Sequence, residues 1–445
     1  MRKIGIICII MSLVFVLSAL VSCGKKNNTE EEVDLNVAYD TRATIKVGIT
    51  TDPREKTFIE GLANSFNQIY PNVSVEVVQI AGDFVKEIGT RRIAEKSTPG
   101  TMPDIILSNS ENAYTFISYG VFENLSTYVA YEEQTNANYM DQFYDFFMKL
   151  GQKNLNGDQY VLPRSADRVV THINKAILQE AGVDMNVVKN GWTWDDFLSV
   201  CAIVRAHFDK TGRSNKYLVD SYINWEAVAY PIFSSFGVKF FGENNKVTVD
   251  SEETKNALNL MKDLVDKRYI APLNSDTSAN FEGGQGAMLF HSAPVYQYHD
   301  LLKDDYDVVT FPLIGDNPKI GAGLAGYGIS SLSRNKAVAW KFLSYMLTRD
   351  GQDALADSGS VCLPIRKDMA DYKTNKWGMK YGKLNMSAYS YKIEYNQATD
   401  IYLSFPASNQ ADIISAMSDL VTNYLRGDSY EKAISIFKMN INDLD

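Results

Sequence analysis

Three charged residues interrupt two apolar runs near the middle of the chain. Residues 160–163 and 169–173 have the pattern of strands, and Arg164, Asp167 and Arg168 lie in the break between them. A continuous buried strand would carry no charges there, so we interpret the break as a crossing between two lobes, with some of the charges facing a cleft. The alternative is an exposed turn, in which Asp167 forms a surface ion pair with Arg164 or Arg168.

A second polar cluster follows a short apolar run. Residues 103–107 have the pattern of a buried strand, and they lead directly into Ser108, Asn109 and Glu111. Loops after the carboxyl ends of strands are where α/β sheets bind ligands. These residues are therefore candidates for ligand contacts.

The elements that must position these residues alternate between strand and helix. Residues 45–49 read as a strand, apolar residues from 58 to 69 recur at helical spacing, and residues 73–78 read as the next strand. This order predicts a parallel α/β sheet. Two amphipathic helices close the chain at 413–425 and 430–441, whereas residues 368–404 show only weak periodicity.

Composition limits the class of protein. A chain of 445 residues is too long for one ordinary core, which favours two lobes or more. Its net charge of -10 argues against nucleic acid as a partner. The four histidines show no metal-ligand spacing, and we expect neither a metal nor a cofactor. Cys201 and Cys362 could pair, or both could be buried free thiols.

The N-terminus has the pattern of an export signal. Arg2 and Lys3 precede an almost wholly apolar run over residues 4–20, and the segment ending at Cys23 resembles the bacterial lipobox. This resemblance implies a signal peptide over residues 1–22, lipidation of Cys23, and a membrane anchor on the extracytoplasmic side. Residues 23–43 are polar and predict a flexible tether.

Several segments, taken in order, resemble family 1 extracellular solute-binding proteins, the sugar-capturing lipoproteins of ABC importers. They run from the lipobox to the C-terminal helices and so cover nearly the whole chain. The segments are Tyr70-Pro71-Asn72-Val73, Pro103-Asp104-Ile105-Ile106, Leu162-Pro163 with Ile173-Asn174-Lys175, Trp192-Thr193-Trp194-Asp195-Asp196-Phe197, Gly286-Ala287-Met288, Tyr327-Gly328-Ile329-Ser330, and Ala339-Trp340-Lys341-Phe342-Leu343.

The resemblance implies an α/β, two-lobed, type II periplasmic-binding-protein-like fold. Each lobe is expected to be a mainly parallel sheet flanked by helices, and hinge strands join the lobes. Residues 44–164 plus 311–360 would form lobe 1, and residues 165–310 plus 361–445 would form lobe 2. A monomer of this kind would capture a mono- or oligosaccharide between its lobes and deliver it to the permease subunits of an ABC transporter.

The resemblance also extends the set of expected ligand contacts. The full set is Thr51, Asp52, Arg54, Ser108, Asn109, Glu111, Arg164, Asp167, Trp225, His291, Ser292, Tyr296, Tyr327 and Arg366. Trp225 and Tyr327 could offer an aromatic face to a sugar ring, and the polar groups could bind its hydroxyls. Trp225 could instead pack in the core, Tyr327 could be structural, and His291 could be an ordinary buried histidine.

Two departures from the family pattern concern the aromatic platform. No Trp follows Ala287-Met288, where Pro294 and Tyr296 stand instead, and no aromatic residue accompanies Ser108 and Asn109. The alternative functions are an exported carbohydrate-active enzyme that uses two carboxylates, and a binding protein for a solute other than a sugar. No sequence motif marks a catalytic residue, and we expect a protein that is not an enzyme.

Overall fold

The computed structural model describes residues 35–271, 280–359, 363–370 and 376–442, except for the side chains of Tyr296 and Trp377. The compact unit described below begins at Val37. Cys23 and Cys362, and therefore the predictions of lipidation and of a disulfide, lie outside the described residues. Cys201 is a buried free thiol.

The first lobe is built on a five-stranded sheet with the order β2-β1-β3-β10-β4. Its strands are β1 (Ala43–Ile49), β2 (Val73–Gln79), β3 (Ile105–Asn109), β4 (Val161–Pro163) and β10 (Ala325–Ile329). β1 pairs in parallel with β2 and β3, while β10 pairs antiparallel with β3 and β4. The predicted parallel start of the sheet is therefore confirmed, and the returning chain makes the sheet mixed.

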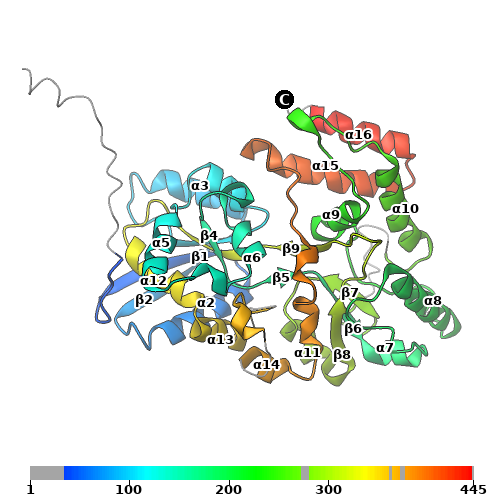
Figure 1. Cartoon of the computed structure of the whole chain (residues 1–445), viewed down its shortest axis with the longest axis horizontal. Helices are drawn as coiled ribbons and strands as arrows, with labels where there is room; N and C mark the ends of the chain where they lie inside the picture. Colours follow the sequence, from blue (N-terminus) through cyan, green and yellow to red (C-terminus); the bar gives the residue numbers. More distant parts are fainter. Residues whose placement is uncertain (1–34, 272–279, 360–362, 371–375, 443–445) are drawn as a thin grey trace, which may run out of the picture. The chain divides into compact units, whose positions relative to one another are not determined.

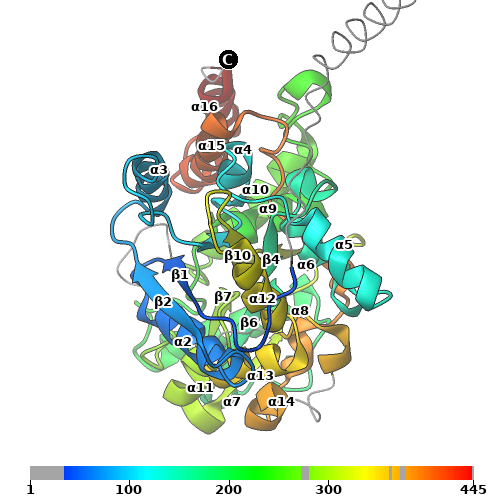
Figure 2. The same cartoon turned by 90° about the vertical axis from the view of Figure 1, so that its left-hand side faces the viewer.

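Helices of the first lobe gather beside this sheet. Figure 2 shows α2 (Pro53–Phe66), α12 (Lys336–Met346) and α13 (Arg349–Asp357) grouped together near β1 and β2. The same lobe holds α3 (Phe84–Ala94), α4 (Ala113–Ser118), α5 (Ser126–Thr135) and α6 (Asp145–Leu150). Asp52 caps α2 by accepting a hydrogen bond from the Arg54 N–H, and Pro53 at the first helical position needs no partner for its nitrogen.

The second lobe contains a three-stranded sheet with the order β7-β6-β8. β6 (Val170–Asn174) pairs antiparallel with both β7 (Met288–His291) and β8 (Tyr306–Thr310). The expectation of a mainly parallel sheet is wrong for this lobe. An alternation of strands and helices predicts parallel pairing only when each helix is a single crossover, and several helices separate β6 from β7.

Helices form the rest of the second lobe. They are α7 (Lys175–Glu180), α8 (Trp194–Lys210), α9 (Glu226–Ser235), α10 (Glu252–Asp266), α11 (Tyr296–Leu302), α15 (Ala407–Leu425) and α16 (Tyr430–Asn442). A further helix, α14 (Lys376–Tyr381), contacts α13 of the first lobe. The Thr193 side chain accepts from the Asp196 N–H and Asp196 accepts from the Thr193 N–H, so the predicted capping box begins α8. Within the described residues, no helix is both long and apolar enough to cross a bilayer.

Short strands connect the two lobes. β5 (Asp167–Arg168) pairs with β9 (Ile320–Gly323), which also pairs with β11 (Asn396–Gln397). Figure 1 shows β5 and β9 between the two larger sheets. The interpretation of residues around Asp167 as a crossing is confirmed by this arrangement, since β4 belongs to the first sheet and β6 to the second.

Close backbone approach explains one glycine of the connecting strands. A Cβ atom on Gly321 would lie 1.8 Å from the Ala227 carbonyl oxygen at the start of α9. Only glycine permits α9 and β9 to pack at this distance. The start of α9 is thereby held against the connecting strands.

Candidate functional site

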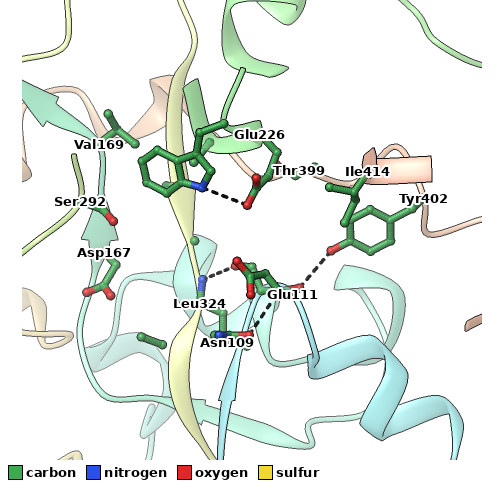
Figure 3. A pocket seen from close by; sticks show the side chains of 16 residues that line it. Asn109, Glu111, Asp167, Val169, Glu226, Ser292, Leu324, Thr399, Tyr402 and Ile414 are labelled. Atoms are coloured by element: carbon green, nitrogen blue, oxygen red, sulfur yellow. Dashed lines mark hydrogen bonds between the residues drawn. The ribbon is translucent and has the colours of Figure 1, made fainter. Parts of the chain in front are cut away.

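A cavity of about 250 Å³ lies where the two lobes and the connecting strands meet. Its wall combines polar side chains with small and apolar ones from seven segments of the chain. The lining residues are Asn109, Ser110, Glu111, Asp167, Val169, Trp225, Glu226, Ala227, Ser292, Ala322, Gly323, Leu324, Ala325, Thr399, Tyr402 and Ile414 (Figure 3). We call this cavity the interlobe pocket.

The turn after β3 supplies the first-lobe wall of the interlobe pocket. The Asn109 side-chain oxygen accepts a hydrogen bond from the Glu111 N–H at 3.1 Å, and this bond shapes the turn. Asn112 accepts hydrogen bonds from the Asn109 N–H and from the Ser108 hydroxyl. Ser108 is fully buried and therefore lies behind the wall, whereas Asn109 and Glu111 reach the pocket.

Hydrogen bonds to the connecting strands hold this turn in place. The Ser110 hydroxyl accepts from the Leu324 N–H at 2.7 Å, and the Ser110 N–H donates to the Leu324 carbonyl at 3.1 Å. The Tyr402 hydroxyl donates to the Ser110 carbonyl at 3.2 Å. Figure 3 shows these bonds at the centre of the site, where the first lobe meets the segment that precedes α15.

The start of α9 supplies the aromatic side of the interlobe pocket. Trp225 is half-buried, and its indole N–H donates to the Glu226 carboxylate at 3.1 Å. The His291 ring stacks on Trp225, with 5.4 Å between the centroids and 27° between the planes. The side chain of Trp225 is therefore fixed from two sides while it lines the pocket.

His291 supports Trp225 as a neutral ring. Its Nδ1 atom accepts a hydrogen bond from the Ala293 N–H at 2.8 Å, which requires that Nδ1 carries no proton. Surrounding protein atoms that displace water lower the pKa of His291, and the positive charge of Arg54 lowers it further. His291 thus lies beside the site but does not line the pocket.

Asp167 and Ser292 complete the polar wall. Asp167 lies on β5 opposite Gly323 of β9, and its carboxylate accepts from the Ser165 hydroxyl. Ser292 follows directly after β7. A Cβ atom on Gly323 would lie 3.0 Å from the Ser110 hydroxyl oxygen, so a side chain at this position would press on the turn after β3.

The predicted contacts divide into two groups. Asn109, Glu111, Asp167, Trp225 and Ser292 line the interlobe pocket together. Of the remaining predicted residues, none is part of the lining, and Tyr296 is the first residue of α11, with a side chain outside the described part of the structure.

Arg164 and Tyr327 belong to a buried cluster within the first lobe. Arg164 Nη1 lies 2.6 Å from both carboxylate oxygens of Glu55 on α2, and the Tyr327 hydroxyl donates to the same carboxylate at 3.1 Å. Both side chains thus donate hydrogen bonds to the same Glu55 carboxylate. Neither residue is part of the lining of the interlobe pocket, and these contacts favour a structural role for both.

Three further predicted residues each form an ion pair with a residue two positions away. Asp52 and Arg54 form an ion pair at 2.7 Å, next to the exposed Thr51. Arg366 binds the Asp368 carboxylate at 2.9 Å and lies over the Phe143 ring. None of these residues is part of the lining of the interlobe pocket.

The structure adds lining residues that the sequence did not point to. Glu226 is one residue beyond the predicted Trp225, and that adjacency was the only signal for it. Thr399 and Tyr402 lie in the segment without clear periodicity, and Ile414 lies on α15. Among the described residues, no group of three His, Cys, Asp or Glu side chains is placed to hold a metal ion.

Known proteins resemble this chain in sequence and in fold. An arabinooligosaccharide-binding protein of Halalkalibacterium halodurans is 29% identical over 160 residues, which is 36% of this chain and 31% of that protein. The chain thus matches about a third of the length of this curated relative.

Solved structures share the fold over almost the whole chain. A substrate-binding protein of Listeria monocytogenes in complex with cycloalternan has a TM-score of 0.71 at 21% identity, covering 91% of this chain and 99% of its own. Maltose-bound MalE3 of T. maritima has a TM-score of 0.68 at 18% identity, covering 90% and 100%. The GacH receptor of Streptomyces glaucescens has a TM-score of 0.66 at 20% identity, covering 91% and 99%.

These similarities confirm the expected two-lobed fold of the periplasmic binding proteins. The family model for bacterial extracellular solute-binding proteins matches residues 50–353, well over half of the chain. Its members bind solutes outside the cytoplasm and are not classed as enzymes. The chain belongs to the bacterial extracellular solute-binding proteins.

Proposed function

We propose that this protein captures a carbohydrate in the interlobe pocket and delivers it to the permease of an ABC transporter. The observation that carries the proposal is the composition of the pocket wall. Polar groups of both lobes surround one half-buried indole ring, as a ligand with many hydroxyls and an apolar ring face requires. The arabinooligosaccharide-binding relative supports the same class of ligand.

The proposed contacts have complementary roles. The carboxylates of Glu111 and Asp167 accept hydrogen bonds from sugar hydroxyls, and charged acceptors form the stronger bonds. The Asn109 amide can both donate and accept, while Ser292 offers a hydroxyl. Trp225 provides the ring face on which an apolar side of the sugar packs.

Capture in this pocket would couple binding to closure of the lobes. Asn109 and Glu111 belong to the first lobe, whereas Trp225 and Ser292 belong to the second. A ligand that contacts both groups stabilises the closed state, because it gains all of these contacts only when the lobes are together. We propose lobe boundaries at 44–164 plus 311–360 and at 165–310 plus 361–445, which assign the sheet β2-β1-β3-β10-β4 to one lobe and the sheet β7-β6-β8 to the other.

We further propose that the protein is a monomer held at the extracytoplasmic face of the cell membrane by lipid on Cys23. The motivation is the lipobox-like segment that ends at this residue. Mass spectrometry of the protein from the native membrane would detect acyl chains on Cys23. A processed chain without lipid at this residue would contradict the anchor but not the capture of a sugar.

A thermal-shift screen against carbohydrates, followed by calorimetry, tests the proposed function. A sugar that binds only the folded protein raises the melting temperature, by an amount that grows with its concentration relative to Kd. Chromatography of the same mixtures after long incubation checks for turnover. Binding with the sugar recovered intact is expected; new products would favour the carbohydrate-active enzyme, and no binding across the panel would refute carbohydrate capture.

A further inference from the structure

The charges that line the interlobe pocket all have one sign. Glu111 follows β3, Asp167 lies on β5, and Glu226 begins α9, so the three carboxylates come from three separate segments. No Lys, Arg or His is among the sixteen described residues of the lining. The interlobe pocket is the site of the proposed function, and these three carboxylates are its charged groups.

The arginines closest to the interlobe pocket in sequence are turned toward other partners. Arg164 binds Glu55 at 2.6 Å within the first lobe. Arg168 is fully buried and donates to the backbone carbonyl groups of residues 391 and 392. Arg54 binds the carboxylate that caps α2. None of these guanidinium groups lies in the lining, although Arg164 and Asp167 attract one another electrostatically.

The carboxylates of the two lobes influence one another. Figure 3 shows Glu226 and Glu111 reaching the interlobe pocket from opposite sides. Burial raises the pKa of Glu226, and the negative charge of Glu111 raises it further. The pKa of Tyr402 is also raised, first by burial and then by neighbours that include Asp400, Glu226 and Glu111. Glu111 and Glu226 therefore repel one another across the pocket.

We propose that the ligand of the interlobe pocket is a carbohydrate that carries a protonated amino group. Its ammonium would lie between Glu111 and Glu226 and offset their mutual repulsion as the lobes close. The neighbouring Trp225 ring would add a cation–π attraction. This inference rests on the proposed function, and it names the substrate class that the same site prefers.

The same charges would act against anionic sugars. A uronic acid or a sugar phosphate would bring a further negative charge to a wall that already holds three. At contact distance, one repulsive pair is equivalent to between about fivefold and about a thousandfold in affinity, depending on the effective dielectric constant. We therefore expect amino sugars to bind at least about tenfold more tightly than their neutral counterparts, and uronic acids most weakly.

Calorimetry with charge-matched sugars tests the inference. Each set contains a neutral hexose oligosaccharide, its 2-amino-2-deoxy analogue and its uronic acid analogue, in the gluco, galacto and manno series. The expected affinity order is amino, neutral, anionic in every series that binds. Raising the salt concentration should narrow the differences, since screening weakens charge pairs.

Two isosteric variants separate charge from shape. Glu226→Gln keeps an oxygen that can accept from the Trp225 N–H, and Glu111→Gln removes the opposing charge. Each should lower the affinity for the amino sugar at least about fivefold more than the affinity for the neutral sugar, because the amide keeps an oxygen for sugar hydroxyls and loses only the charge. Glu252→Gln is the matched control: Glu252 is exposed and begins α10, as Glu226 begins α9, but it does not line the pocket.

The outcomes distinguish this inference from the proposed function. Equal affinity for neutral and amino sugars, or tightest binding of a uronic acid, would overturn the inference and leave carbohydrate capture standing. A preference for amino sugars that Glu252→Gln reduces as much as Glu226→Gln would also overturn it, because net charge would then be the cause. Failure of every carbohydrate to bind would refute both.

Discussion

Removing Glu55 should destabilise the first lobe strongly, because its partner is a buried cation. The side chains of Arg164 and Glu55 are only 10% and 12% exposed, and the two groups lie 2.6 Å apart. Burial favours loss of the Arg164 proton, but the neighbouring Glu55, Tyr327 and Asp167 together more than offset this and raise the pKa of Arg164. Tyr327 donates to the same carboxylate at 3.1 Å.

Glu55→Ala would leave this guanidinium without its counter-charge and the Tyr327 hydroxyl without its acceptor. Breaking a buried pair by removal of one partner costs about 3–5 kcal/mol. We expect a loss of this size in the free energy of unfolding, measured by urea denaturation with circular dichroism at pH 7. Replacing both partners by apolar residues, as Glu55→Leu with Arg164→Met, should restore much of it.

Glu60→Ala is the matched control on the same helix. Glu60 pairs with Lys56 at 3.6 Å, but both side chains are about half exposed. Such a pair contributes only about 0.3–0.5 kcal/mol. If Glu55→Ala destabilises no more than Glu60→Ala, or if it leaves stability intact and abolishes ligand binding, then Arg164 and Glu55 belong to the site and our reassignment is wrong.

Two further predictions concern packing and pH. Gly321→Ala should lower the free energy of unfolding by about 1–3 kcal/mol, because its Cβ would lie 1.8 Å from the Ala227 carbonyl oxygen. In the control variant Gly89→Ala, on α3, the new Cβ meets no atom within 4 Å, and the free energy of unfolding should rise by about 0.5–1 kcal/mol. Similar denaturation midpoints for the two variants would contradict this prediction. Burial, and then the proximity of His291, lowers the pKa of His172 from 6.5 to about 3, so the unfolded chain takes up a proton that the folded protein does not. Between pH 6.5 and pH 5 the stability should therefore fall by about 2 kcal/mol more than it does in His172→Gln, which lacks this group.

The sequence predicted the elements whose residues interact locally. The capping box at Thr193 and Asp196 and the spacing of apolar residues in α8 and α15 are local signals, and the structure confirms these helices. The loop after β3 could be predicted as a ligand site for the same reason. Its position follows from the end of an apolar strand, without knowledge of its neighbours.

The features that the sequence did not predict depend on contacts between residues far apart in the chain. From the sequence we predicted that Arg164 faces the cleft. The structure shows that it binds Glu55, which lies 109 positions away in the chain. The sequence did not predict Thr399 and Tyr402 as lining residues. Their segment contains only a short 3-10 helix and a two-residue strand, which are too short to produce a periodic pattern of apolar residues. The antiparallel pairing of β6 likewise depends on strands that lie more than a hundred residues further along the chain.

The central claim is that a carbohydrate binds in the interlobe pocket against Trp225. Its most direct test is the affinity of Trp225→Ala for the sugar that binds tightest in the screen, compared with Tyr222→Ala. Tyr222 is a nearby aromatic residue that is 68% exposed and does not line the pocket. Loss of the indole face should weaken binding at least about tenfold, and loss of Tyr222 should leave it unchanged. Unaltered affinity in Trp225→Ala, with a large loss of stability, would return this residue to the core and contradict the account.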